Sequence, residues 1–140
     1  MQLVDFILCD DIRSEQFNKV SLMGLYNEAL NIEYQDLNAI KFPIGVKLGV
    51  YIRFRIDKDD KLKKDESLLF SLAVRANNLS DELVKVEGRF NYDNELSPFI
   101  AIPLVLPPIP VKGEGKLTFD FNINNCSFKH DFEIRLRHKN

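Results

Sequence analysis

Tryptophan is absent from this chain of 140 residues, and cysteine and histidine occur only twice each. Two cysteines are too few for the dense disulfide framework of small secreted domains, so Cys9 and Cys126 are expected to be free thiols. The first residues contain neither a basic region nor an apolar run typical of a signal peptide. No apolar run is long enough to span a bilayer. A cytoplasmic protein is therefore expected.

A strong excess of charge of one sign is also lacking. The formal net charge of -2 gives no overall attraction to nucleic acid or to an anionic membrane. Hydrophobic residues at 45% and charged residues at 29% are ordinary for a globular protein. A chain of this length can bury a sizeable core without a metal or a disulfide. We therefore expect one domain over residues 1–140.

The most regular pattern in the chain covers residues 46–56. Every even position there is apolar, and the odd positions carry Lys, Gly, Tyr or Arg. Successive side chains of a β-strand point to opposite faces. The segment therefore predicts a long strand with one face toward a core and the other toward water or a partner. Other strands are expected to collect around its apolar face.

Further strands are predicted where apolar and polar residues alternate between turn residues. Residues 27–41 fit either a strand or a helix face, and we expect an extended segment followed by a turn. Gly24 indicates a bulge or a close backbone approach, and Gly88 indicates a bulge. Pro103 is expected at a sheet edge or bulge, because proline cannot donate to the ladder. The predicted strands cover residues 3–9, 20–26, 46–56, 67–76, 83–90, 99–106, 117–123 and 132–137.

About eight strands at this spacing predict an all-β protein. The fold expected from them is an antiparallel two-sheet sandwich, immunoglobulin-like or C2-like. The one-sided alternation argues against a parallel sheet, whose strands are buried on both faces. The proline-rich residues 107–110 are expected to form a stiff connection between two strands.

A motif in the N-terminal third is followed by Phe42-Pro43 and the alternating segment 46–56. The motif reads Asn18-Lys19-Val20-Ser21-Leu22-Met23-Gly24-Leu25-Tyr26. This layout resembles a family of small, largely uncharacterised bacterial proteins, whose motif reads Gly-Lys-x-Ser/Asn-Leu-x-Gly-x-Phe/Tyr. The likeness extends to the proline-rich stretch, Gly115 and residues 117–121, whereas Asn18 stands where the family has Gly. The resemblance implies a β-sandwich, and it supplies neither an activity nor functional residues.

An acidic loop directly follows the segment 46–56. Hard cations take several oxygen ligands, and C2-type domains gather aspartates in such loops. Asp57, Asp59 and Asp60 are therefore the candidates for a metal or small-ligand site at the end of the fold. Lysines are interleaved with these aspartates, so a solvated loop is the interpretation that we favour. No metal and no cofactor is expected.

The outer face of the segment 46–56 is the main candidate for binding. Arginine with an interleaved aromatic suits single-stranded nucleic acid, but the acidic total favours a solvated face or a protein contact. The apolar run 99–106 fits either a strand buried on both faces or one that meets a partner, since exposed apolar patches mark interfaces. The predicted partner-binding residues are Tyr51, Arg53, Arg55, Ile100 and Ile102.

Catalytic signatures are missing from the sequence. His130 could pair with Cys9 or Cys126 as base and nucleophile, but no nucleophile elbow, phosphate loop or zinc spacing supports it. We therefore expect no enzyme. The leading hypothesis is a protein-interaction or self-assembly module that uses an outer sheet face or edge to meet another protein or a second copy. The alternatives are a ligand- or metal-binding sandwich and an accessory protein of a phage or mobile element.

Overall fold

A computed structural model describes residues 1–62, 66–76, 82–92 and 98–139. Within these residues the chain forms eleven strands and three short 3-10 turns, so the predicted all-β class is confirmed. The turns are η1 (Gln16–Asn18), η2 (Leu37–Ala39) and η3 (Lys58–Asp60). The strands are β1 (Gln2–Ser14), β2 (Val20–Tyr26), β3 (Ala29–Tyr34), β4 (Ile44–Val46), β5 (Gly49–Arg55), β6 (Glu66–Ala76), β7 (Glu82–Tyr92), β8 (Phe99–Val105), β9 (Ile109–Val111), β10 (Gly115–Ile123) and β11 (Cys126–His138).

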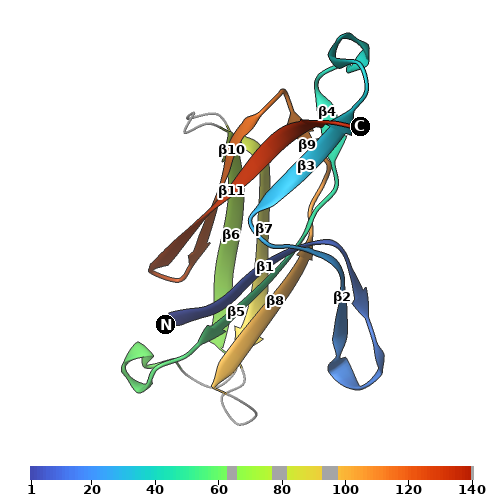
Figure 1. Cartoon of the computed structure of the whole chain (residues 1–140). Coiled ribbons are helices and arrows are strands. Elements are labelled where there is room, and N and C mark those ends of the chain that lie inside the picture. The colour runs from blue at the N-terminus through green and yellow to red at the C-terminus, as the bar shows by residue number, and fades with distance from the viewer. Residues whose placement is uncertain (63–65, 77–81, 93–97, 140) are drawn as a thin grey trace.

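The described strands form three sheets (Figure 1). Sheet A has the order β2-β1-β5-β8, sheet B has the order β3-β11-β10-β6-β7, and sheet C pairs β4 with β9. The prediction of a purely antiparallel arrangement was wrong, because β3 and β11 run parallel and make sheet B mixed. The expected proline-rich connection contains part of β9. Strands of three residues are too short for alternation to reveal them.

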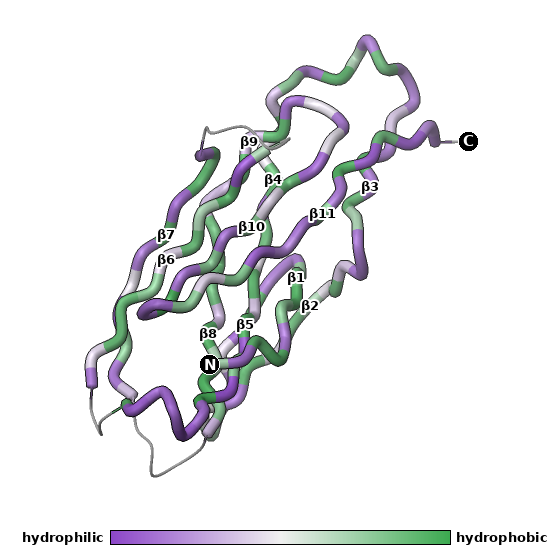
Figure 2. The backbone as a smooth tube through the Cα atoms, turned by 90° about the vertical axis from the view of Figure 1, so that its left-hand side faces the viewer, coloured by the Kyte–Doolittle hydropathy of each residue, from purple (hydrophilic) through white to green (hydrophobic). Residues whose placement is uncertain are grey.

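One hydrophobic core joins the sheets. β5 contributes Ile52 and Phe54, which have no exposed surface, as the alternation predicted. Across the core, the ring centroid of Phe6 on β1 lies 5.7 Å from that of Phe119 on β10. The rings of Phe54 and Phe121 are 6.4 Å apart. These contacts place the inner faces of sheets A and B against each other, and Figure 2 shows the two groups of strands on opposite sides of the molecule.

Two of the glycines inside strands lie beneath side chains of a neighbouring strand. On β7, a Cβ at Gly88 would come within 2.7 Å of Cε1 in the ring of Phe70 on β6. On β2, Gly24 has a φ of +66°, and a Cβ there would lie 2.9 Å from the carboxylate carbon of Asp10 on β1. The Asp10 carboxylate also accepts a hydrogen bond from the hydroxyl of Tyr26. The close approach predicted at Gly24 is found and is made by the Asp10 side chain, whereas the bulge predicted at Gly88 is not found, because the β6–β7 register shifts between Val74 and Arg75.

The β1–β2 hairpin is longer than predicted, because β1 continues past Cys9 to Ser14. At its tip, the backbone N–H of Glu15 donates to the carbonyl of Lys19 over 2.8 Å. Phe17 lies at this tip with φ 59° and ψ 38°, and 87% of its surface is exposed. The hairpin projects from the body at the end opposite to the β9–β10 connection (Figure 1).

β8 is the outer strand of sheet A. It carries Pro103, so the prediction that this proline sits at a sheet edge is confirmed. Just outside the paired residues, the N–H of Leu106 donates to the carbonyl of Leu48 over 3.0 Å, and the carbonyl of Pro98 accepts from the N–H of Ile56 over 2.7 Å. The even positions of β8 therefore form the hydrogen-bonded pairs with β5. Because hydrogen-bonded and non-hydrogen-bonded pairs alternate, the nitrogen of Pro103 points toward the free edge. No ladder hydrogen bond to β5 is lost by having proline there.

Candidate functional site

Three of the predicted partner-binding residues lie on the outer face of sheet A. Tyr51, Arg53 and Arg55 are the odd positions of β5, whose even positions face the core. Paired residues of neighbouring strands share a face of the sheet. The pairing with β1 and β8 sets three rows across this face: Ile7, Tyr51 and Pro103; Asp5, Arg53 and Ala101; and Gln2, Arg55 and Phe99.

Arg53 is held within this face by two contacts. Its Nε donates to Oδ2 of Asp5 over 2.7 Å. Its guanidinium carbon lies 5.3 Å from the ring centroid of Phe99, a distance at which a cation and an aromatic face attract. The Arg53 charge is therefore balanced by a neighbouring strand on one side, and its flat group covers an aromatic ring on the other.

Arg55 is also paired within the chain. One of its terminal nitrogens donates to Oε1 of Gln2 over 2.5 Å. Its Nε lies 3.5 Å from Oδ1 of Asp57, which follows β5. Both arginines of the outer face thus have an acidic neighbour, so their positive charge is largely neutralised locally. This arrangement does not provide the uncompensated positive surface that a nucleic-acid site requires.

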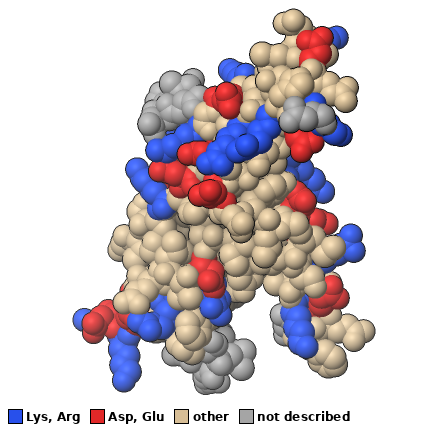
Figure 3. Space-filling model, viewed as in Figure 1, with Lys and Arg blue, Asp and Glu red and all other residues tan. Residues whose placement is uncertain are grey.

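Exposed apolar side chains extend the face at both edges of sheet A. On β8, Phe99 is 43% exposed and Val105 is 49% exposed. On β2, Leu25 is 60% exposed. Leu25 pairs with Cys9, Cys9 pairs with Gly49, and Gly49 pairs with Val105, so Leu25 and Val105 lie in one row across the sheet. Figure 3 views this side of the molecule and shows a mostly uncharged area over β5 and β8. We call this surface, formed by Leu25, Ile7, Tyr51, Arg53, Phe99, Pro103 and Val105, the sheet A face.

Ile100 and Ile102 do not belong to the sheet A face, which corrects the prediction. Ile102 is only 6% exposed, and Ile100 is partly buried against the core. They pair with Phe54 and Ile52, so they face inward with these residues. The outward residues of β8 are instead the odd positions, including Phe99. Both sets of positions are apolar, so the sequence alone did not distinguish the inner set.

The acidic loop after β5 is engaged in its own contacts. Asp57 and Asp60 form a reciprocal capping box around η3. The ammonium group of Met1 donates to Oδ1 of Asp60 over 2.9 Å and lies 3.5 Å from Oδ2 of Asp57. Burial alone would raise the pKa of Asp60, but the hydrogen bond from the Met1 ammonium, the backbone N–H of Asp57 and the ammonium charge together outweigh it, so the pKa is lowered. Among the described residues no group of three or more His, Cys, Asp or Glu side chains gathers as a metal site would require, and Asp59 joins no such group.

The two cysteines are free, and Cys9 is fully buried. Its thiol donates to the carbonyl of Gly49 over 3.6 Å, and burial raises its pKa, so it lacks the character of a reactive thiolate. Cys126 lies at the start of β11 and is partly buried. His130 is on the same strand, where its ring stacks on Phe6 at 4.6 Å. The histidine therefore packs between the two main sheets.

Stability should fall when His130 is protonated. Burial lowers the pKa of His130 below 6.5, with the charge of Asp131 acting more weakly in the opposite direction. Between the folded and unfolded pKa values the unfolded chain binds more protons, so this contribution is present above pH 6.5 and is lost as pH falls toward the folded pKa. We expect urea unfolding to show lower stability at pH 5 than at pH 7.5, with a smaller difference for His130→Phe. An unchanged difference in the variant would contradict this prediction.

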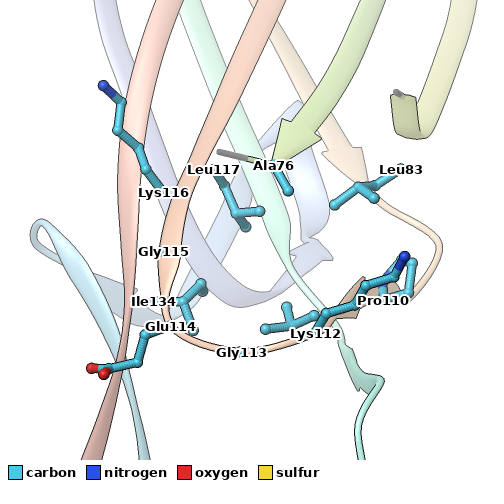
Figure 4. Close-up of a pocket in the computed structure, with 11 residues that line it drawn as sticks. Ala76, Leu83, Pro110, Lys112, Gly113, Glu114, Gly115, Lys116, Leu117 and Ile134 are labelled. Carbon is cyan, nitrogen blue, oxygen red and sulfur yellow. The ribbon is translucent and has the colours of Figure 1, made fainter. Parts of the chain in front are cut away.

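A cavity of about 200 Å³ opens at the end of the core near the β9–β10 connection. Figure 4 shows Ala76, Leu83, Leu117 and Ile134 around its centre, while the charged ends of Lys116 and Glu114 point away from it. Leu117 and Ile134 are each 3% exposed, so the cavity floor belongs to the core. Sequence analysis did not predict this cavity, because its walls come from β6, β7, β9, β10 and β11.

No family model matches this chain, and no curated protein matches it significantly. Within the part of the chain that the structure describes, no helix has the length and apolar character needed to cross a membrane. A function for this chain is therefore inferred from the surfaces described above.

Proposed function

We propose that this chain is a non-enzymatic interaction module whose sheet A face binds a second copy or another protein. Sheets A and B share one core, so the proposed fold of the domain is a two-sheet sandwich with sheet C as a small side sheet. The observation that carries the proposal is the set of exposed apolar side chains on both edges of one regular surface, Leu25 on β2 and Phe99 and Val105 on β8. The resemblance to small bacterial sandwich proteins stays a prediction.

The polar part of the sheet A face supports a protein contact. Arg53 and Arg55 are neutralised by Asp5 and Asp57, so the face carries little net charge to repel an identical or neutral surface. Tyr51 lies between Ile7 and Pro103, where a rigid amphipathic ring is surrounded by apolar neighbours. Tyrosine and arginine surrounded by apolar contacts are the residues that most often dominate binding energy at protein interfaces.

Replacing Tyr51 and Arg53 together with Ala is expected to weaken association at least about tenfold, which corresponds to roughly 1.4 kcal/mol. The melting temperature should change by no more than about 4 °C, because the lost ion pair and ring contact lie at the surface. Association is measured by sedimentation velocity and melting by circular dichroism. A large loss of stability with association unchanged would overturn the proposal.

The matched control is Lys85→Ala on the outer face of sheet B. Lys85 forms a comparable surface ion pair with Glu87 over 3.2 Å. It lies on β7, away from the sheet A face. The variant removes one surface charge pair, as Arg53→Ala does, but it should leave association unchanged. Equal weakening in the control would show that general surface charge, not this face, controls association.

A native mass spectrum of the purified protein tests whether the partner is a second copy. A species at twice the 16.2 kDa chain mass that disappears in the Tyr51 and Arg53 variant would support self-association through this face. A monomer would direct the search to a different protein. In that case a specific partner is one that binds the wild type and the Lys85→Ala control but not the variant with Tyr51 and Arg53 replaced by Ala.

A further inference from the structure

Phe17 occupies an unusual conformation for its residue type. Its φ of 59° and ψ of 38° lie in the left-handed region, which glycine and asparagine adopt readily and bulky residues rarely do. The tip is closed by the Glu15 to Lys19 backbone hydrogen bond, so the ring is held outward with 87% of its surface exposed. The fold alone would favour glycine or asparagine here. A strained and exposed aromatic residue on a closed turn indicates a contact made by its side chain.

The cavity near the β9–β10 connection has the size and chemistry to receive such a side chain. A dry cavity of about 150 Å³ lined by aliphatic and aromatic groups can hold benzene. The cavity here is about 200 Å³; Ala76, Leu83, Val111, Leu117 and Ile134 supply its apolar part, and residues 112–116 add polar groups to its lining. A phenyl ring therefore fits it, and the apolar lining in Figure 4 would replace the water that now surrounds Phe17.

The ring and the cavity cannot meet within one chain. The hairpin tip and the β9–β10 connection lie at opposite ends of the molecule (Figures 1 and 2). Charge does not oppose their meeting between two chains. Glu15 and Lys19 flank Phe17 in sequence, and the cavity lining includes Lys112, Glu114 and Lys116, so both ends carry side chains of both charge signs.

We propose that Phe17 of one chain inserts its ring into the apolar cavity of a second copy. Each chain then offers a ring at one end and a cavity at the other. A contact between two different surfaces of the same protein leaves one ring and one cavity unused in a dimer, so further copies can add. The assembly forms a ring if the rotation between successive copies closes it, and an open filament if it does not. This assembly uses a different part of the molecule from the sheet A face and does not depend on it.

The first test compares the wild-type chain with Phe17→Asn by sedimentation velocity from 10 μM to several hundred micromolar. The wild-type average mass should rise with concentration and exceed twice the 16.2 kDa chain mass, with no plateau at the mass of a dimer. Asparagine suits the left-handed backbone, so Phe17→Asn should fold at least as well as the wild type while its association weakens at least about tenfold. Unchanged association in this variant would overturn the proposal.

The second test blocks the cavity. Ala76→Ile adds bulk from the wall of β6 and should remove the growth with concentration, and Leu83→Phe does the same from β7 if the first variant unfolds. Mixing Phe17→Asn with Ala76→Ile then gives the decisive result. The first protein keeps an intact cavity and the second keeps an intact ring, so the mixture should form a one-to-one complex that grows no further.

The remaining outcomes also decide the question. A wild-type chain that stays monomeric at every concentration overturns the proposal, and so does a cavity variant that assembles as the wild type does. A mixture of the two variants that forms no complex overturns it as well. Because Tyr51 and Arg53 belong neither to the hairpin tip nor to the cavity lining, their double Ala variant should keep the Phe17-dependent growth. Failure of one proposal is therefore distinguishable from failure of the other.

Discussion

Replacing Gly88 with Ala is expected to lower the free energy of unfolding by about 1–3 kcal/mol, a typical cost of overpacking a core. The added methyl would lie 2.7 Å from Cε1 of Phe70, closer than real Cβ contacts allow. The Phe70 ring has little freedom to move away, because it also packs against Phe90 and Phe121 at 6.2 and 6.1 Å. The chain has no tryptophan, so urea unfolding is followed by circular dichroism.

Gly45→Ala is the control for the Gly88 experiment. Its nearest neighbour would be Cβ of Pro108 at 3.5 Å, an ordinary contact, so stability should change little. In a Phe70→Leu background the ring is gone, and Gly88→Ala should cost much less than in the wild type. An equal cost in both backgrounds would show that the ring is not the cause.

Phe121→Ala is expected to cost about 3–5 kcal/mol, the range measured when a fully buried phenylalanine is truncated. Phe121 has no exposed surface, and its ring lies 6.4 Å from Phe54 on sheet A and 6.1 Å from Phe70 on β6. Truncation would leave a cavity between the two main sheets. Equilibrium urea unfolding measures the loss, provided the variant is still folded without denaturant.

Phe128→Ala is the matched control for Phe121→Ala. Phe128 is stacked on the same ring at 6.4 Å, but it is only partly buried. Its truncation should cost about 1–2 kcal/mol, since less apolar surface is lost from the core. If the two variants lost equal stability, the centre of the core would not lie where the structure puts it.

The parts of the fold that sequence analysis predicted are those set by local patterns. Burial of one face imposes a two-residue period, so the alternation through β5 identified Ile52 and Phe54 as core residues. A close approach at Gly24 was also predicted, because glycine inside a strand has few other uses. The all-β class followed from the same alternation in other segments.

The parts that were missed depend on pairing between distant segments. The parallel partner of β3 is β11, at the other end of the described chain. The sequence placed Ile100 and Ile102 at the binding surface, but pairing with β5 turns them inward. Each strand of sheet C is too short to show a period.

The candidate surfaces follow the same division. Tyr51, Arg53 and Arg55 were found from one strand alone, and the structure places them on one face. Their acidic neighbours Asp5 and Asp57 became visible only through β1 and the loop after β5. The cavity has walls from five strands, so no local pattern could predict it.

Pro103 limits how this protein can aggregate. A bare strand edge is a template on which another chain can add a strand, and such growth leads to amyloid-like stacks. β8 has an apolar sequence and, among the described strands, no neighbour on one side in sheet A, a combination that favours this growth. Pro103 interrupts the row of outward N–H groups at its centre without loosening the strand from β5. The proline thus acts as a gatekeeper, leaving the broad surface of the strand open to specific contacts while its backbone stays protected from indiscriminate ones.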